Sequence, residues 1–419
     1  MPVLTDISTL YRCLDEGGQS AVHPVRDAAV AWRNGVIEWA GAARDLPQRF
    51  TGEPLASARG ACVAPGLVDS HTHLAFGGWR ADEFERRLRG ESYLDIARSG
   101  GGIMRTVEQT RSASDEELVE HCMRNLERMA VLGVTTVECK TGYGLSTPEE
   151  LRILRLYRKI NAEQPLELVS TLLAAHVNPN PSVCDNDCYI DDIIQNLLPA
   201  VAEESLARFN DVFVEEGAFT HDQARRLLMA GARLGLAPKL HVDQLGDSGG
   251  ATLAAEAGAV SADHLEYTTH AGIQAMARAG VVAGCLPIAT LYLHQKPMDG
   301  RAFVEAGVPV AVATDFNPGS APSFDLHLAM MLACTMCRLT PAEALKGATI
   351  FAARSLSLDD RIGSVEPGKQ ADLCLIDAKD VNDWMVHFRP NRCVATFVQG
   401  RQIAGTPLPM SRIVSGNPS

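Results

Sequence analysis

The chain has 419 residues, of which 46% are hydrophobic and 21% are charged, and its formal net charge is -13. This length exceeds what one small core needs, so we expect one large domain with a smaller one beside it. The negative charge argues against binding to nucleic acid or to an anionic membrane surface, because both need a basic face. It favours a small-molecule partner whose anionic part is held by a local cation.

The N-terminus and the cysteines indicate a cytoplasmic protein. The sequence has no apolar stretch of about 18 residues, and its first residues lack the basic start and apolar core of a signal peptide. Its 11 cysteines are scattered and odd in number, so they form no disulfide framework and we expect most to be reduced. Cys334 and Cys337 have C-x-x-C spacing, but the apolar segment 325–337 around them is typical of a core helix.

Both ends of the chain are predicted to be rich in β-strands. Residues 29–33 and 36–39 flank Asn34-Gly35, a pair that supplies the positive φ angles of a two-residue hairpin turn. Near the other end, residues 371–377, 394–398 and 402–403 also have strand character. We expect the two ends to pair into one small β-sandwich domain formed by residues 1–65 and 359–419.

The middle of the chain, residues 66–358, alternates between short apolar runs and segments of helical composition. The predicted strands are residues 61–68, 134–139, 166–174, 212–215, 238–242, 260–265, 281–286 and 308–314. The predicted helices are residues 115–132, 148–162, 221–234, 268–279 and 298–306. Eight strands with helices between them predict an α/β fold, a (β/α)8 barrel. Residues 178–204 are expected to be an insertion that is acidic over residues 185–192 and helical after them.

Reactive side chains follow the predicted strands, as expected for a barrel whose active site lies at the C-terminal ends of its strands. They are His71, His73, Lys140, Tyr143, His176, Glu215, Glu216, His241, Asp243, His264 and Asp315. Packing alone does not explain polar groups gathered at one mouth.

Four of these residues form a set suited to one divalent metal, zinc or iron(II): His71, His73, His241 and Asp315. A metal there would lower the pKa of a bound water from about 15.7 towards roughly 7. Asp315 could then act as a weak ligand and as the general base, and His264 could hold the attacked carbonyl or assist proton transfer.

Each of these assignments has a structural alternative. His264 could be a structural hydrogen-bonding residue, and His241 could be a core histidine. Asp315 could cap the turn over residues 317–320. Lys140 could be carbamylated to bridge two metals, but without a second ligand set a salt-bridge role is favoured.

The sequence resembles the amidohydrolase superfamily and, more narrowly, the imidazolonepropionase family of histidine degradation. The superfamily resemblance rests on DSHTH at 69–73, ATD at 313–315, GKQADL at 368–373 and the β domain made from both ends. The narrower one rests on HTHLAFGGWR at 71–80, residues 83–103, ECKTGYGL at 138–145, AAH at 174–176, HVDQL at 241–245, SADHL at 261–265 and TDFNPGS at 314–320. Together these blocks cover nearly the whole chain.

The resemblance implies hydrolysis of the ring amide of 4-imidazolone-5-propanoate to N-formimidoyl-L-glutamate. It implies a metal at His71, His73, His241 and Asp315, and it makes Asp315, His264 and Gln244 the catalytic candidates. It implies substrate contacts from Arg80, Tyr93, Tyr143, His176, Gln244, Asn317, Gly319 and Ser320. Arg80 suits the propionate carboxylate, with which it can pair bidentately. A homodimer is common in this superfamily.

Two other functions compete with this one. The first is another mononuclear amidohydrolase, either a different cyclic-amide hydrolase or a ring deaminase. A deaminase would need an acidic proton shuttle close after the histidine of the fifth strand, where this chain has Gln244, an amide. A non-catalytic scaffold would have lost at least one metal ligand, and none is missing. The sequence departs from the family pattern at Trp79, at Thr141, over residues 286–293 and at Cys184 and Cys188. We expect these positions to lie near the mouth and to bear on substrate choice.

Overall fold

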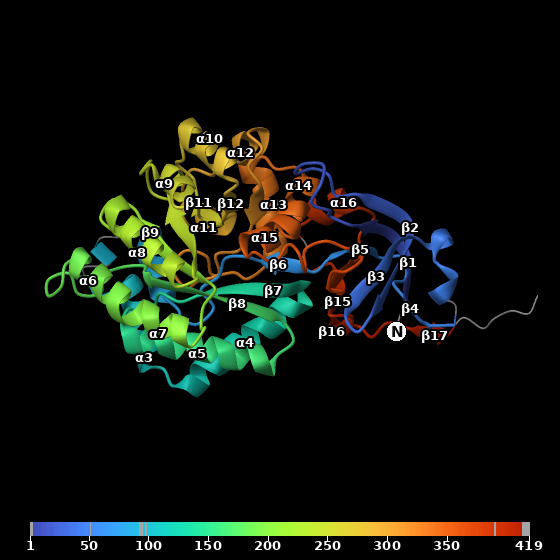
Figure 1. Cartoon of the computed structure of the whole chain (residues 1–419), viewed down its shortest axis with the longest axis horizontal. Helices are drawn as coiled ribbons and strands as arrows, with labels where there is room; N and C mark the ends of the chain where they lie inside the picture. The colour runs from blue at the N-terminus through green and yellow to red at the C-terminus, as the bar shows by residue number, and fades with distance from the viewer. Residues whose placement is uncertain (1–2, 51, 92–94, 97–98, 389–390, 413–419) are drawn as a thin grey trace, which may run out of the picture.

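The computed structural model describes residues 3–50, 52–91, 95–96, 99–388 and 391–412. A barrel surrounded by helices occupies one end of the molecule, and a smaller β domain occupies the other (Figure 1). Strands from the start of the chain and from its end lie side by side in that smaller domain. Among the residues described, no helix has both the length and the apolar character needed to cross a membrane.

Within the described ranges, eight parallel strands form the barrel, in sequence order around the sheet. They are β6 (Leu67–Asp69), β7 (Val134–Lys140), β8 (Glu167–Ala175), β9 (Phe209–Val214), β10 (Ala237–Val242), β11 (Ser261–His264), β12 (Val282–Cys285) and β13 (Val310–Val312). The expected (β/α)8 barrel is therefore confirmed, and each predicted apolar run overlaps one of its strands. The near-continuous burial of these strands is typical of parallel sheets covered by helices.

The barrel closes between its first and last strands through residues that lie just beyond them. Thr72 forms a parallel bridge with Phe316. The N–H of Asp315 donates to the carbonyl of His71 at 2.9 Å, and the N–H of His73 donates to the carbonyl of Phe316 at 2.9 Å. This closure sets His71, His73 and Asp315 on two backbone segments in fixed register.

Helices surround the barrel and include the five predicted from the sequence. In the part of the chain that is described, they are α1 (Ala81–Leu88), α3 (Ile103–Ser112), α4 (Asp115–Val131), α5 (Thr147–Glu163), α6 (Asn186–Asp192), α7 (Leu198–Glu203), α8 (His221–Arg233), α9 (Gly250–Glu256), α10 (His270–Ala279), α11 (Pro287–Leu293), α12 (Gly300–Glu305), α13 (Leu326–Cys337), α14 (Pro341–Gly347), α15 (Ile350–Ser355) and α16 (Val381–Met385). Capping boxes at Ser114, Thr220 and Thr340 explain where α4, α8 and α14 begin.

An apolar cluster links the strands of the barrel to the segment that begins with α15. Ala352, Leu356 and Ile362 pack with residues from the starts of several strands, including Val68 and Phe209. The N–H of Val68 also donates to the carbonyl of Ala348 at 2.9 Å. This end of the barrel is therefore filled by apolar side chains.

The small domain is a sheet made from both ends of the chain. Nine of the described strands form it: β1 (Val3–Tyr11), β2 (Pro24–Arg33), β3 (Val36–Ala42), β4 (Pro54–Ser57), β5 (Cys62–Pro65), β14 (Leu373–Ile376), β15 (Cys393–Val398), β16 (Arg401–Gly405) and β17 (Met410–Arg412). Short 3-10 turns follow β3, η1 (Ala43–Asp45) and η2 (Gln48–Phe50). The predicted hairpin joins β2 to β3, with φ values of 51° at Asn34 and 81° at Gly35.

One predicted strand, residues 61–68, is divided between the two domains. β5 pairs with β1 and β14 of the small sheet, whereas β6 begins the barrel. The turn comes at Gly66, whose N–H donates to the carbonyl of Asp372 at 2.8 Å. A Cβ at residue 66 would overlap the side chain of Thr135, so glycine is required where the chain passes between the sheets.

The insertion at residues 178–204 is helical in its second half, as expected. It contains α6, the π-helical turn η3 (Ile193–Leu197) and α7. Cys184 and Cys188 form a disulfide just before and within α6. The other nine cysteines are free and mostly buried, in agreement with the expectation that most are reduced. Cys337 is buried at the end of α13, as expected for a core position, whereas Cys334 is half-buried.

Candidate metal centre

His71 and His73 lie in the segment that leaves β6, and His241 lies near the end of β10. The ring centroids of His71 are 5.4 Å from His73 and 4.5 Å from His241, and those of His73 and His241 are 5.7 Å apart. One nitrogen from each imidazole lies within 4.8 Å of the others, which is close enough for one ion to bind all three. All three residues are buried.

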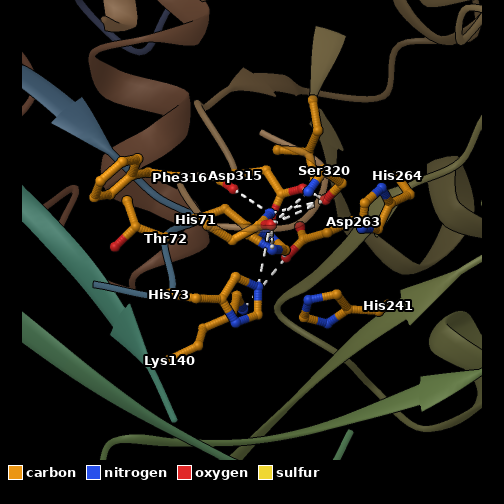
Figure 2. Close-up of polar contacts among 12 residues, drawn as sticks. His71, Thr72, His73, Lys140, His241, Asp263, His264, Asp315, Phe316 and Ser320 are labelled. Atoms are coloured by element: carbon orange, nitrogen blue, oxygen red, sulfur yellow. Dashed lines mark hydrogen bonds and ion pairs between the residues drawn. The ribbon is translucent and has the colours of Figure 1, made fainter. Parts of the chain in front are cut away.

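Asp315, which follows β13, completes the cluster. Its Oδ1 lies 3.4 Å from Nε2 of His71 and 3.4 Å from Nε2 of His73. Figure 2 shows its carboxylate facing the imidazoles of His71 and His73, with His241 beside them. Burial raises the pKa of Asp315, but the two imidazoles that face its carboxylate outweigh burial and hold that pKa well below its usual range. The residue adopts a left-handed φ of 56°.

The nitrogens of this cluster have the free positions that a metal needs. Nε2 of His71 and Nε2 of His241 are buried and have no hydrogen-bond partner among the described residues. Unpartnered buried polar atoms are rare in folded proteins and call for an explanation such as an ion. Three imidazoles and one carboxylate form a donor set typical of zinc and also suited to iron(II). The residues therefore fit a divalent metal.

Carboxylates behind the cluster orient two of the imidazoles. Nδ1 of His71 donates to Asp263 at 2.8 Å, and Nδ1 of His241 lies 3.0 Å from Asp211. Such outer carboxylates fix the tautomer of a histidine and leave its Nε2 for a metal. Burial and Lys140 lower the pKa of His71, but Asp263 and Asp315 outweigh them and raise it to about 9.

A buried lysine links these carboxylates. Nζ of Lys140 lies 2.7 Å from Asp211, 3.2 Å from Glu138 and 3.5 Å from Asp263. Burial lowers the pKa of Lys140, but the three carboxylates outweigh it and raise that pKa above its ordinary value. Nζ of Lys239 donates to Glu138 at 2.8 Å. Lys140 thus forms salt bridges, the role that the sequence favoured over carbamylation.

His264 lies at the same mouth, beyond the metal cluster. Its ring centroid is 5.8 Å from that of His71 and 5.5 Å from that of His241. It adopts a left-handed φ of 80°, which is unusual outside glycine and is often found at functional sites. Its Nδ1 lies 3.9 Å from the buried carboxylate of Glu266.

Arg80 reaches the mouth from the N-terminus of α1. Its side chain is only 11% exposed, and a Cβ at Gly319 would overlap its guanidinium. The turn that carries Gly319 is ordered by Asn317, whose Oδ1 accepts hydrogen bonds from the N–H groups of Gly319 and Ser320 at 2.7 and 2.8 Å. Nδ2 of Asn317 also donates to the carbonyl of Asp315. The cation is therefore held against the loop that begins at Asp315.

Tyr143 and His176 form a second wall beside His73. The ring of His176 stacks on that of His73 at 5.3 Å, and its centroid lies 5.7 Å from that of Tyr143. Burial and the neighbouring His73 lower the pKa of His176 to about 3, so its imidazole is neutral at physiological pH. Nδ1 of His176 lies 3.2 Å from the carbonyl of Gly142 and so donates to it.

Two other predicted site residues have different surroundings. Gln244 is 9% exposed and follows β10, and its backbone N–H donates to the carboxylate of Glu215. Asp243 accepts hydrogen bonds from Ser248 and from the start of α9, which gives it a structural role. Tyr93 lies outside the described residues.

Comparison with known proteins shows the family of this chain. Residues 62–403 match the amidohydrolase family. The chain is 43% identical to the imidazolonepropionase of Geobacillus kaustophilus over 383 residues, which cover 90% of each chain. It is 42% identical to that of Shewanella frigidimarina over 397 residues, which cover 94% of this chain and 96% of the relative. The chain belongs to the imidazolonepropionase family of amidohydrolases.

Solved structures outside the imidazolonepropionases share the fold. An adenosine deaminase from Xanthomonas campestris with bound zinc aligns with a TM-score of 0.73 at 20% identity, covering 96% of this chain and 92% of its own. A triazine hydrolase variant aligns with a TM-score of 0.78 at 17% identity, covering 96% and 94%. At these identities the likeness shows a common fold, with the barrel and the small β domain together.

The buried charges behind the ligands were not predicted from the sequence: Glu138, Asp211, Lys239 and Asp263. A signal was present in the spacing of polar residues within two strands. Glu138 and Lys140 are two residues apart in β7, and Lys239 and His241 are two residues apart in β10, so each pair points to one face of its strand. Charged residues repeated within an apolar strand indicate a polar barrel interior rather than a packing face.

Proposed function

We propose that this chain hydrolyses the ring amide of 4-imidazolone-5-propanoate to N-formimidoyl-L-glutamate, with one divalent metal, zinc or iron, at His71, His73, His241 and Asp315. The observation that carries the proposal is the position of the Arg80 guanidinium, held against the loop that begins at Asp315. A cation at that position suits the carboxylate of a small anionic substrate. The name of the relatives that share over 40% of the sequence gives that substrate.

The reaction adds water across the carbon–nitrogen bond of the ring amide. A bond forms between the water oxygen and the carbonyl carbon, the bond from that carbon to the ring nitrogen breaks, and the nitrogen gains a proton. A divalent metal at the cluster supplies Lewis-acid activation of the water and of the carbonyl. The protein must therefore remove a proton from water and deliver one to nitrogen.

Asp315 and His264 are suited to these proton transfers. The carboxylate of Asp315 is ionised because two histidines hold its pKa well below the usual range, so it can accept the proton of water. His264 lies beside His71 and His241 and can hold the attacked carbonyl or assist delivery of the proton to the leaving nitrogen. Gln244 carries an amide, so in this proposal it contributes hydrogen bonds and no proton transfer.

The remaining residues bind the substrate. Arg80 pairs with the propionate carboxylate, and the turn containing Asn317, Gly319 and Ser320 supports it. Tyr143 and the neutral imidazole of His176 offer hydrogen bonds to the ring and to the carboxyl groups. Tyr93, by its place in the sequence pattern, is proposed to contact the substrate as well.

The test is turnover of freshly generated imidazolone-propionate by protein purified without chelator, with the product detected by mass spectrometry. The control is Asp315→Asn, which keeps the size of the side chain and removes the base. Formimidoyl-glutamate from the native protein alone would support both the substrate and the role of Asp315. Absence of product from protein that carries about one metal ion would reject this substrate. Elemental analysis of the purified protein would decide between zinc and iron.

A further inference from the structure

Lys140 lies at the centre of the buried charges beneath the metal cluster. It is fully buried at the end of β7, and its Nζ donates to Asp211 at 2.7 Å and to Glu138 at 3.2 Å. The same nitrogen lies 3.5 Å from Asp263. One ammonium therefore contacts three carboxylates, one each from β7, β9 and β11.

Two of these carboxylates stand directly behind metal-binding imidazoles. Asp263 accepts a hydrogen bond from Nδ1 of His71 at 2.8 Å, and Asp211 lies 3.0 Å from Nδ1 of His241. Asp263 and Asp211 are both buried. Lys140 thus joins the two histidines through two carboxylates, in one continuous path from strand to strand.

The physical need for a cation at this point follows from charge. Buried carboxylates that share a site repel each other, and without an opposite charge one of them would turn away or take up a proton. Either change would remove the hydrogen-bond acceptor that orients its histidine. The ammonium of Lys140 prevents both changes, since it lies within ion-pair distance of the two carboxylates at once.

We propose that Lys140 is a positioning residue that fixes His71 and His241 for a single metal ion, acting through Asp263 and Asp211. Its ammonium serves as a permanent cation in the space behind the imidazoles. His71, Glu138 and Asp263 lie close enough there to form a second group of possible metal ligands. Lys140 contacts both of those carboxylates, so the protein's own cation neutralises the group and the centre holds one metal.

Lys239 is the matched comparison for this role. It is as buried as Lys140, and its Nζ donates to Glu138 at 2.8 Å and lies 5.0 Å from the centre of the Phe209 ring. Among the ion pairs of the described residues, Lys239 has none with Asp211 or Asp263. Removing Lys239 deletes the same buried charge from the same cluster, but it leaves the link between the two histidines intact.

The inference rests on the metal centre proposed above and is independent of the substrate. The experiment measures zinc affinity of the metal-free full chain by competition with a chromophoric chelator, for wild type, Lys140→Met and Lys239→Met. We expect Lys140→Met to weaken zinc binding by roughly 10- to 100-fold, the usual effect of losing an outer partner of a metal ligand. Lys239→Met is expected to bind zinc within a few-fold of wild type, whatever its effect on thermal unfolding.

Charge-balanced variants keep the test decisive if Lys140→Met fails to fold. Two double variants each remove one positive and one negative charge: Lys140→Met with Glu138→Gln, and Lys239→Met with Glu138→Gln. They differ only in which lysine is lost. The same difference in zinc affinity between this pair supports the proposal. Equal affinities within either pair would overturn it. Wild-type protein that binds no zinc would overturn the metal centre itself, which separates that failure from a failure of Lys140 alone.

Discussion

The guanidinium of Arg80 lies against the backbone of Gly319, in the space that a Cβ at residue 319 would fill. The glycine has no positive φ in its favour, so its requirement here is close approach and not backbone conformation. Its turn follows Asp315 directly and is held by Asn317. A predicted substrate-binding cation and a predicted metal ligand are thereby connected through one short loop.

Gly319→Ala is expected to displace Arg80 and to weaken substrate binding. The overlapping group is the end of a flexible side chain, so the protein should fold while the guanidinium moves. We expect KM to rise roughly 10- to 100-fold, the equivalent of losing a charged hydrogen bond, with a smaller effect on kcat. Steady-state kinetics would measure this. The matched control is Gly246→Ala, because a Cβ there meets nothing within 4 Å. An unchanged KM for Gly319→Ala would remove Arg80 from the carboxylate site.

His264→Asn is expected to lower kcat by about 10²- to 10⁴-fold, the range for a lost general acid or base, with metal content unchanged. Asparagine tolerates the left-handed backbone of residue 264, so the fold should survive. Kinetics would be combined with metal analysis of the purified variant. Loss of the metal from this variant would make His264 a ligand and contradict its assignment to proton transfer.

Zinc binding by the metal-free protein is expected to strengthen as pH rises from about 6 to about 9. A metal ligand must be unprotonated, and Asp263 and Asp315 raise the pKa of His71 to about 9, so a proton on this histidine competes with zinc below that pH. Burial lowers the pKa of His73, so a proton on His73 competes with zinc only at lower pH than a proton on His71 does. Chelator competition at several pH values would measure the slope. A flat profile between these limits would contradict the proposed state of His71.

Asp372 is expected to make the folded protein less stable as pH rises from about 4 to about 7. Burial raises its pKa from 3.8 to about 7, although its carboxylate accepts a hydrogen bond from the N–H of Gln399 at 2.7 Å. Between these values the folded state binds more protons than the unfolded state, so the free energy of unfolding falls with increasing pH. Asp372→Asn keeps an acceptor for Gln399 and removes the charge.

Urea unfolding of the native protein and of Asp372→Asn across this pH range would test the effect. The difference in unfolding free energy between them should grow in favour of the asparagine variant as pH rises. Parallel pH profiles for the two proteins would show that Asp372 ionises without penalty in the folded state.

The sequence predicted the barrel well because each parallel strand is a short apolar run, and because reactive residues follow strand ends in such barrels. It predicted the Asn34-Gly35 hairpin because that pair has a strong preference for left-handed backbone. The division of residues 61–68 escaped it, since an apolar run does not reveal which sheet its halves join. The Cys184–Cys188 disulfide also went unpredicted, because connectivity depends on side chains that meet only after folding.

The sequence alone determined the alternating strands and helices, the small domain built from both ends, and the histidines and aspartate at the mouth. These follow from local patterns and from the direction in which parallel strands run. Only the tertiary structure showed that Lys140 joins Asp211 and Asp263 behind His241 and His71, and that Arg80 lies over Gly319. Such contacts connect residues far apart in the chain, so they are set by how the barrel closes and not by any one segment.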